Sequence, residues 1–333
     1  MAALLNGWII LDKPLGMGST QGVGAVKRAL REGGYTKVKV GHGGTLDPLA
    51  TGVLPIALGE ATKLAGRMLD ASKIYEFTIT FGAETDTLDL EGQVIAESDV
   101  RPTLAQIEAI LPRFTGPIEQ VPPAFSALKV EGKRAYDLAR AGEVVALQSR
   151  AVTVHSLEIK SSPSLSRGGG SREAADGGAL APCRSTTPAA RSPSPSKLGE
   201  DAVTLIAHVS KGTYIRSLAR DIALGLGTVG HVTMLRRTKA GPFALPQAIS
   251  LDKLFEKSKA HALEDVTLPI RTALDDIPAL ALTPEQAELI HHGQVLTGIA
   301  ACDGLQLALS GDTPLALVEV LDGNVRSVRR FNL

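Results

Sequence analysis

The sequence predicts an α+β protein with one large mixed domain and one small, β-rich C-terminal domain. Its 333 residues are enough for about two domains, and 44% hydrophobic residues can form a sizeable core. Segments typical of strands and helices are intermixed up to Pro246, after which one helical segment and then short apolar strand segments follow. Near the end, the pair Asp322-Gly323 predicts a tight β-hairpin turn.

The first half of the large domain is predicted to contain three strands and two helices. Residues 7–31 have the pattern of a short strand, a glycine-rich turn and a helix capped by Ser19 or Thr20. Two further strands are expected at 73–82 and 92–98, joined by an acidic loop. The second helix is expected in TLAQIEAILPRF, because its apolar residues fall on one helical face.

The second half of the chain continues the mixed pattern and then changes. Its predicted elements, in chain order, are a short helix within 132–145 that ends at Gly142, strands at 151–160 and 201–215, and a helix at 217–227. A connecting helix is expected at 251–267. It would separate a large domain, residues 1–250, from a small domain, residues 268–333.

Residues 161–200 differ in composition from the strands on either side. Nine serines, six glycines and five prolines fill half of these 40 positions, and aromatic residues, Ile and Val are missing. Such a segment buries too little apolar surface to offset the entropy lost on ordering. We expect a disordered loop at the tip of a hairpin formed by the flanking strands.

Charge is unevenly distributed along a chain whose formal net charge is zero. Six basic residues and one acidic residue lie between Ser210 and Ala240, whereas six acidic residues and no basic one lie between Gly82 and Asp99. A basic face on a neutral protein can bind a polyanion such as a nucleic acid. Two ordinary solvated surfaces would give the same pattern, so both interpretations stay open.

The cysteine count and the hydropathy pattern narrow the class of protein. The two cysteines are far apart in the sequence, which supports neither a disulfide framework nor a zinc site. The N-terminus lacks the basic region of a signal peptide, and no later stretch is long and apolar enough to span a bilayer. We therefore expect a cytoplasmic protein.

The segment GHGGTLDPLATGVLP is the most unusual part of the sequence. Gly41, Gly43 and Gly44 permit positive φ angles and the close approach of a backbone or a ligand. Asp47 before Pro48 is typical of a helix or turn start that is capped by the carboxylate. On this segment alone, a capping role and a catalytic role are equally well supported.

Six motifs occur in one order along the chain. They are DKPLGMGST, GHGGTLDPLATGVLPIALGEATK, KIYEFTITFGAETDTLDLEG, PPAFSALKVEGKRAYDLARAG, SKGTYIRSLARDIA and HVTMLRRTKAGPF. Over residues 7–160 and 201–250 the chain closely resembles the TruB family, bacterial tRNA pseudouridine synthases that isomerise uridine-55 in the TΨC arm. The resemblance implies a catalytic domain with a mixed, mainly antiparallel sheet and an RNA-binding thumb at 126–150. Residues 268–333 look, more loosely, like the small PUA-like β-barrel domain of this family.

The resemblance implies catalytic roles for three residues. Asp47 matches the aspartate that attacks the target nucleoside, at uracil C6 or ribose C1′, or that removes a ribose proton. Arg216 matches the arginine that pairs with this aspartate, by a contact expected to be bidentate, and keeps it ionised in a pocket without water. Tyr75 matches the tyrosine that stacks on the flipped uracil and is a candidate general base. Taken alone, Arg216 and Tyr75 are more typical of a surface salt bridge and a core aromatic.

The resemblance also implies residues that bind the RNA, whose target base must leave its stack before it reacts. His42 matches the histidine that enters the RNA loop beside the extruded base, although a turn residue between glycines has the same pattern. Leu235 matches an apolar wall of the uracil pocket, or else simply packs in the core. The remaining candidates are basic residues expected to face phosphates: Lys63, Arg67, Lys129, Lys133, Arg134 and Arg140.

The implied partner is the T-arm of tRNA, with no cofactor, metal, membrane or protein partner, and we expect a monomer. The main alternative is a non-catalytic RNA-binding or RNA-folding protein, but we would expect that protein to lack Asp47, Tyr75 or Arg216. A metal-dependent hydrolase using His42 and Asp47 would need further ligands. The chain departs from the family pattern at Gly43, where Ala or Thr is usual, and in its Ser/Gly/Pro-rich insertion.

Overall fold

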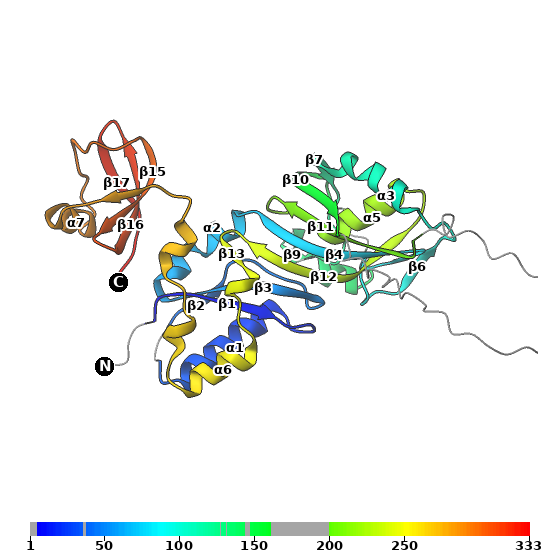
Figure 1. Cartoon of the computed structure of the whole chain (residues 1–333), viewed down its shortest axis with the longest axis horizontal. Helices are drawn as coiled ribbons and strands as arrows, with labels where there is room; N and C mark the ends of the chain where they lie inside the picture. The colour runs from blue at the N-terminus through cyan, green and yellow to red at the C-terminus, as the bar shows by residue number, and fades with distance from the viewer. Residues whose placement is uncertain (1–4, 36–37, 127, 131, 144–146, 161–199) are drawn as a thin grey trace, which may run out of the picture.

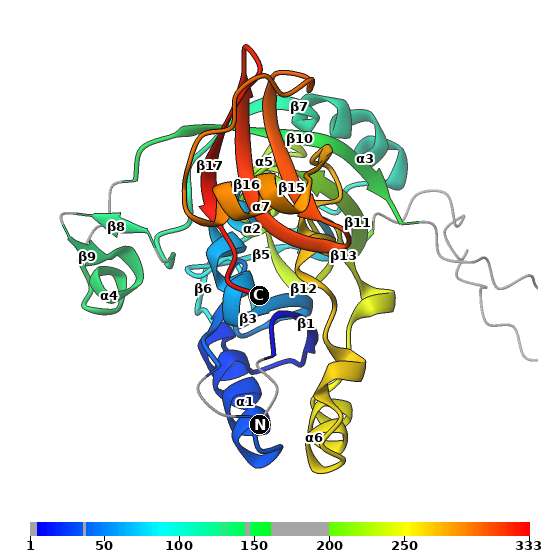
Figure 2. The same cartoon turned by 90° about the vertical axis from the view of Figure 1, so that its left-hand side faces the viewer.

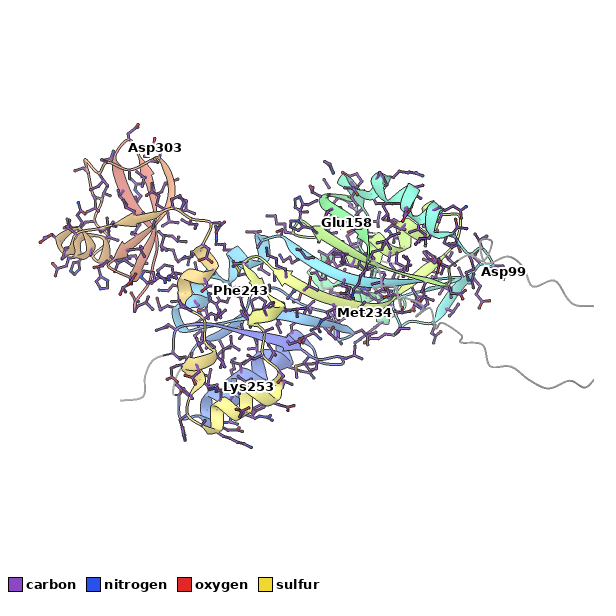
Figure 3. The ribbon with its side chains drawn as sticks, in the orientation of Figure 1. Asp99, Glu158, Met234, Phe243, Lys253 and Asp303 are labelled. Carbon is purple, nitrogen blue, oxygen red and sulfur yellow. The ribbon has the colours of Figure 1, made fainter. Side chains whose placement is uncertain are left out.

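The computed structural model describes residues 5–35, 38–126, 128–130, 132–143, 147–160 and 200–333. Figure 1 shows an elongated molecule with a large central sheet and a smaller sheet, near the C-terminus, at one end. In Figure 3 the labelled Asp303 lies in the part with the smaller sheet, and the labelled Asp99 lies at the opposite end of the molecule. The acidic segment and the C-terminal sheet are therefore remote from each other.

The large sheet has nine strands, and its main path runs β1-β3-β12-β4-β11-β10-β7, with β2 paired to β3 and β13 paired to β12. Their bounds are β1 (Gly7–Lys13), β2 (Val40–His42), β3 (Ala50–Leu58), β4 (Lys73–Phe81), β7 (Gly116–Gln120), β10 (Arg150–Ile159), β11 (Ala202–Val209), β12 (Gly230–Ala240) and β13 (Phe243–Ala244). Neighbouring strands are antiparallel except β12 and β3, which run parallel. The prediction of a mixed, mainly antiparallel sheet is confirmed.

One hydrophobic core joins α3 (Leu104–Ile110) and α5 (Ile215–Gly225) to β4, β11 and β12. Ile107, Leu218 and Phe77 are completely buried in it. The apolar face predicted for the first of these helices is confirmed, although the helix is followed by a 3₁₀ turn rather than continuing. This core fixes the start of α5 against the sheet.

A second core contains α1 (Ser19–Glu32) and α6 (Leu251–Lys259), which pack against each other and against β1 and β3. Leu254 is completely buried, and Ser258 Oγ donates a hydrogen bond to Ala29 O at 2.6 Å. The helix predicted to connect two domains over 251–267 is therefore shorter than expected. It belongs to the core of the large sheet.

The predicted cap of α1 is wrong in an informative way. The residue before the helix is Gly18, which offers no capping side chain. Ser19 Oγ instead accepts a hydrogen bond from Leu46 N at 2.7 Å and donates one to Leu46 O at 3.0 Å. The start of α1 is thereby tied to the loop that carries Asp47.

Strands β10 and β11 form the predicted hairpin. Ile159 is opposite Leu205, and Lys160 N donates to Thr204 O at 2.9 Å, so the two ends of the insertion lie close together. The disordered loop predicted at 161–200 lies outside the described residues, except for Glu200. Strand β11 is shorter than predicted because residues 210–214 form the turn into α5.

Near the C-terminus, four strands form a separate sheet in the order β14-β15-β16-β17. The bounds are β14 (Ala279–Ala281), β15 (Gly304–Ser310), β16 (Thr313–Leu321) and β17 (Asn324–Arg330), with α7 (Pro284–His291) packed against them. Asp322 and Gly323 have φ angles of 50° and 69°, as a two-residue hairpin turn requires. The hairpin predicted from this pair is confirmed.

Two small hairpins extend from the large sheet. The acidic loop joins β5 (Ala83–Thr85) to β6 (Val94–Glu97), so an extra short strand separates it from β4. Figure 2 shows β8 (Lys129–Val130), β9 (Lys133–Arg134) and α4 (Ala135–Arg140) projecting from the side of the molecule. The helix predicted within 132–145 therefore starts later than expected.

Among the described helices, none is long and apolar enough to cross a membrane.

Candidate active site

The glycines before Asp47 have different roles. Gly44 adopts a φ of +131°, a conformation that L residues rarely adopt. A Cβ on Gly43 would lie 2.7 Å from Met68 Cβ, so the close approach of α2 (Ala65–Asp70) requires glycine in this chain. Gly41 has open space around it and no positive φ, which contradicts the expectation for this position.

Asp47 lies in a turn and not at the start of a helix. Ala50 N donates to Asp47 O at 3.0 Å, while the carboxylate Oδ2 lies 2.8 Å from Arg216 Nη2. The carboxylate thus pairs with an arginine and does not cap a helix. Its side chain is 47% exposed, which contradicts the expectation of a pocket that excludes water from it.

Arg216, in the first turn of α5, is buried and bridges two carboxylates. Its Nη1 lies 3.2 Å from Asp89 Oδ2 and donates to Thr87 O at 2.8 Å, while Nη2 also donates to Phe125 O at 3.0 Å. The bidentate contact with Asp47 that the sequence suggested is not formed. Each end of the guanidinium serves a different carboxylate, which fixes its plane relative to Asp47.

Asp89 is held as firmly as the arginine that it contacts. Thr87 Oγ1 donates to Asp89 Oδ1 at 2.6 Å, and Glu91 N donates to the same oxygen at 3.0 Å. Leu88 has a φ of +63°, which is rare for a bulky residue and turns the chain so that its neighbour faces inward. The side chain of Asp89 is only 10% exposed, so this carboxylate forms a buried cluster with Arg216 and Thr87.

A cavity of about 240 Å³ opens beside Asp47. It is bounded by the glycine loop, by β4 and β12, and by the turn that precedes α5. Its charged and aromatic or apolar lining includes Asp47, Leu69, Lys73, Tyr75, Arg150, Tyr214, Arg216, Leu235 and Arg237. The structure therefore brings together four of the predicted residues: Asp47, Tyr75, Arg216 and Leu235.

Tyr75 and Leu235 both pack in the core and line the cavity, so their positions are compatible with either of the interpretations that the sequence left open. Tyr75 on β4 lies between Ala207 of β11 and Arg237 of β12, and Leu235 on β12 is opposite Phe77. Both side chains are partly buried and pack against two hydrophobic cores, yet both line the cavity. They form an aromatic and an apolar wall that the cores hold rigidly.

Arg237 is a second buried arginine at this cavity, and it is 1% exposed. Its Nε donates to Val53 O at 2.8 Å and its Nη1 to Thr45 O at 3.0 Å. Within the described residues Nη2 has no hydrogen-bond partner. A Cβ on Gly52, whose φ is +99°, would lie 2.2 Å from Arg237 O, so this glycine lets β3 approach β12.

Two buried lysines add to the positive potential. Burial lowers the pKa of Lys73 to about 8, and the charge of Arg237 acts in the same direction. Burial also lowers the pKa of Lys13 to about 8, although Asp47 opposes this effect. Lys13 Nζ donates to Pro48 O at 3.2 Å, so the first motif of the chain supports the turn that presents Asp47.

His42 lies on β2, outside the lining of the cavity. Gly44 N donates to its Nδ1 at 3.4 Å, which is the arrangement of a turn residue between glycines. Burial lowers the pKa of His42, and the charge of Arg237 lowers it further. The imidazole is therefore held mainly neutral at pH 7.

The predicted phosphate-binding residues are spread over distant parts of the molecule. Lys63 Nζ contacts Glu60 Oε2 at 2.6 Å and Arg330 O at 2.9 Å, and Arg67 pairs with Asp276. These two cations thus tie the segment after β3 to the C-terminal part of the chain. The projecting hairpin of β8 and β9, with α4, carries the others.

On that hairpin, Lys133 and Arg140 are exposed, and Arg140 lies 5.6 Å from the ring centroid of Tyr136. The side chains of Lys129 and Arg134 lie outside what the structure describes. The basic run at 210–240 does not form an open basic face. Four of its six cations have carboxylate partners: Lys211, Arg216, Arg220 and Arg236.

Comparison with known proteins identifies the family of this chain. Residues 31–165 match the model of the TruB family pseudouridylate synthase (N terminal domain), and residues 216–275 match the tRNA pseudouridylate synthase B C-terminal domain. The chain is 60% identical to "tRNA pseudouridine synthase B" of Novosphingobium aromaticivorans over 99% of its length and 98% of that protein. The chain belongs to the TruB family. For the protein of the same name from Zymomonas mobilis, identity is 51%, covering 98% and 96% of the two chains.

Solved structures share the TruB-like fold at lower identity. A chain in a Cbf5-Nop10-Gar1 complex superposes with a TM-score of 0.66 at 23% identity, covering 99% of this chain and 85% of that one. A chain in an H/ACA RNP bound to a substrate RNA containing 2′-deoxyuridine superposes with a TM-score of 0.67 at 21% identity. The superposition covers 99% of this chain and 86% of that one. These likenesses establish the pseudouridine synthase fold and mixed α+β content.

Sequence reasoning missed Asp89, Lys73 and Arg237. Asp89 is one of six acids in a run that indicated a solvated loop, and the only hint was its place in the motif TDTLD between apolar residues. Lys73 and Arg237 are in motifs that carry the family resemblance, but their burial follows from strand pairing. Nothing in the local sequence separates Arg237, which is buried, from Arg236, which pairs with Asp12.

Proposed function

We propose that this chain isomerises uridine-55 in the TΨC loop of tRNA to pseudouridine, with Asp47 as the nucleophile. The observation that carries the proposal is the position of the Asp47 carboxylate, paired with Arg216 at the wall of the cavity of about 240 Å³. This volume is below the range of about 300–1,000 Å³ typical of pockets for drug-sized ligands. It suits a single base extruded from an RNA loop.

The reaction needs no group from outside the protein. The bond between uracil N1 and ribose C1′ breaks, a bond between uracil C5 and C1′ forms, C5 loses a proton and N1 gains one. Asp47 is the group that reacts, at uracil C6, at ribose C1′ or by removal of a ribose proton, and Arg216 compensates its charge. Tyr75 stacks on the base and serves as the candidate general base, and Leu235 forms the apolar wall.

The RNA is bound by surfaces around this cavity. The hairpin with α4 acts as a thumb over residues 126–150, and exposed Lys133 and Arg140 face phosphates. His42, neutral and held by Gly44, enters the loop beside the extruded base. The C-terminal sheet is the PUA-like barrel that we propose over 268–333. The protein acts as a monomer in the cytoplasm, where its substrate is processed.

A short RNA hairpin with the sequence of the T-arm and tritium at C5 of its uridines tests the proposal. Wild-type protein should release tritium from the T-loop uridine and from no other position, because C5 loses its proton only where isomerisation occurs. Asp47→Asn should bind the hairpin with unchanged affinity and release no tritium, since the amide keeps the shape but is no nucleophile. Turnover by this variant near the wild-type rate would favour a merely structural role for Asp47.

A further inference from the structure

We infer that Arg150 binds a phosphodiester of the RNA next to the extruded nucleotide, at the mouth of the active-site cavity. The inference rests on the proposed function, because the anion comes from the RNA substrate. It concerns a residue outside the motifs that carry the family resemblance. Three independent features of Arg150 support it: its place, its rigidity and its unpaired charge.

Arg150 is the first residue of β10, opposite Gln120 of β7, and its side chain lines the same cavity as Asp47. It approaches from the wall formed by the turn before α5, which includes Gly212 and Tyr214. Asp47 and Arg150 belong to different segments of that lining. When the base of a nucleotide occupies the cavity, its sugar-phosphate backbone stays at the opening. A cation in the lining can contact a phosphate there.

The guanidinium of Arg150 is held in place before any RNA binds. Its Cζ lies 4.7 Å from the ring centroid of Tyr214, and its Nη2 donates to Gly212 O at 2.6 Å. Tyr214 is itself clamped by Gln120, whose Oε1 accepts from Tyr214 N at 2.8 Å and whose Nε2 donates to Tyr214 O at 3.1 Å. Because Gln120 is 1% exposed, this support is rigid. Binding then costs little side-chain entropy.

The charge of Arg150 is not matched by the protein. In the part of the chain that the structure describes, it has no carboxylate partner, and its Nε is buried without a hydrogen-bond partner. Lys211 and Arg216, in the following motif, both have carboxylate partners. Of the five N–H donors of its guanidinium, only one therefore has an acceptor among the described residues. A phosphate supplies both the missing charge and acceptors with matching geometry.

A purely structural role is the competing explanation. In that case Arg150 only fills space beside Tyr214 and caps Gly212 O, and its replacement lowers the melting temperature without changing how RNA binding responds to charge. The test must therefore measure the charge interaction itself. It uses the full chain, the T-arm hairpin, and hairpins in which single phosphates beside the target uridine are replaced by neutral methylphosphonates.

Arg150→Gln should weaken hairpin binding about tenfold or more, as loss of a hydrogen bond to a charged group implies, with kcat at saturation little changed. The slope of log affinity against log salt should become shallower by about 0.7–0.9, the value for one phosphate contact. One methylphosphonate should weaken binding to the wild type but not to Arg150→Gln. Arg150→Lys, which keeps the charge, should retain the slope. The control Arg113→Gln removes an exposed arginine outside the cavity and should match the wild type throughout.

The inference would be overturned if every methylphosphonate lowered hairpin affinity equally for the wild type and for Arg150→Gln, and if the salt slope were unchanged. If Arg150→Gln does not fold, Arg150→Met, which keeps an apolar side chain beside Tyr214 but removes the charge, decides: a shallower salt slope with lost sensitivity to that same phosphate supports a phosphate contact, and a slope and sensitivity equal to the wild type contradict it. Failure of the proposed function is visible separately. It would appear as absence of tritium release by the wild type itself.

Discussion

Two buried arginines face the same cavity, and they are held in opposite ways. Arg216 bridges the carboxylates of Asp47 and Asp89. Arg237 is more deeply buried, yet its two hydrogen-bond acceptors are the backbone carbonyls of Val53 and Thr45. An ion pair concentrates the field of a cation on its partners, whereas carbonyl dipoles leave much of its charge uncompensated.

The surroundings of Arg237 reflect this difference. Its charge contributes to the lowered pKa of Lys13, of Lys73 and of His42, on three separate segments. Arg216 therefore interacts mainly with the two carboxylates that it contacts, whereas the charge of Arg237 acts on three groups around it. This difference in pairing predicts different consequences for replacing each arginine.

The largest effect is expected for Arg216→Lys. A single ammonium cannot contact Asp47 and Asp89 as the two guanidinium nitrogens do. Loss of one charge-assisted hydrogen bond is worth about 1.5–3 kcal/mol, which corresponds to roughly a tenfold to hundredfold lower kcat if it is lost in the transition state. Single-turnover tritium release with saturating protein measures it.

The matched control for this variant is Arg220→Lys. Arg220 lies one turn further along α5 and pairs with its neighbour Asp221 at 2.8 Å, not with Asp47 or Asp89. Its replacement should leave kcat unchanged. If Arg216→Lys is also fully active, the bridge between the two carboxylates has no role in catalysis, and the comparison between the two arginines fails.

A smaller effect is expected at His42 when Arg237 is replaced by Gln. Loss of a positive charge makes protonation easier, so the pKa of His42 should rise, although burial still keeps it below the usual value near 6.5. Titration of the imidazole by NMR measures the midpoint. In the pH range just below 6.5, His42 binds fewer protons in the folded wild type than in the unfolded chain. The free energy of unfolding therefore rises as the pH rises through that range, and this rise should be smaller in the variant.

Arg236→Gln is the control for this measurement. Arg236 is adjacent on β12 but pairs with Asp12 at 2.8 Å, so its field is compensated. The midpoint of His42 should not move in this variant. An equal upward shift in both variants would mean that pairing with a carboxylate does not decide how far the charge of an arginine acts.

The sequence allowed prediction of β1, β4, β10 and β11, of the hairpins and of four residues of the cavity, because strand periodicity and family motifs are local signals, but strands β3, β7 and β12 were not predicted. The contacts between distant segments were less accessible. Asp89 joins the cluster through a positive φ at Leu88, and Ser19 binds Leu46 instead of capping its helix. Neither outcome follows from residue order. Both depend on which distant segments become neighbours, as does the burial of Arg237 beside the partly buried Arg236.

The smallest effect is expected from replacing residues 161–200 by a short Asn-Gly turn of about five residues. The insertion joins β10 to β11 at the end of the hairpin where Ile159 pairs with Leu205, whereas Arg150 lines the cavity at the other end of β10. A ten-residue strand separates these ends by about 30 Å. The replacement should therefore not affect Arg216 and Arg237, which line the same cavity as Arg150. Because loop-closure entropy grows only logarithmically with length, the free energy of unfolding should rise by roughly 2 kcal/mol at most. Thermal unfolding and tritium release measure the two quantities. A variant with an unchanged melting temperature but markedly weaker tRNA affinity would show instead that the five basic residues of the insertion contact the RNA.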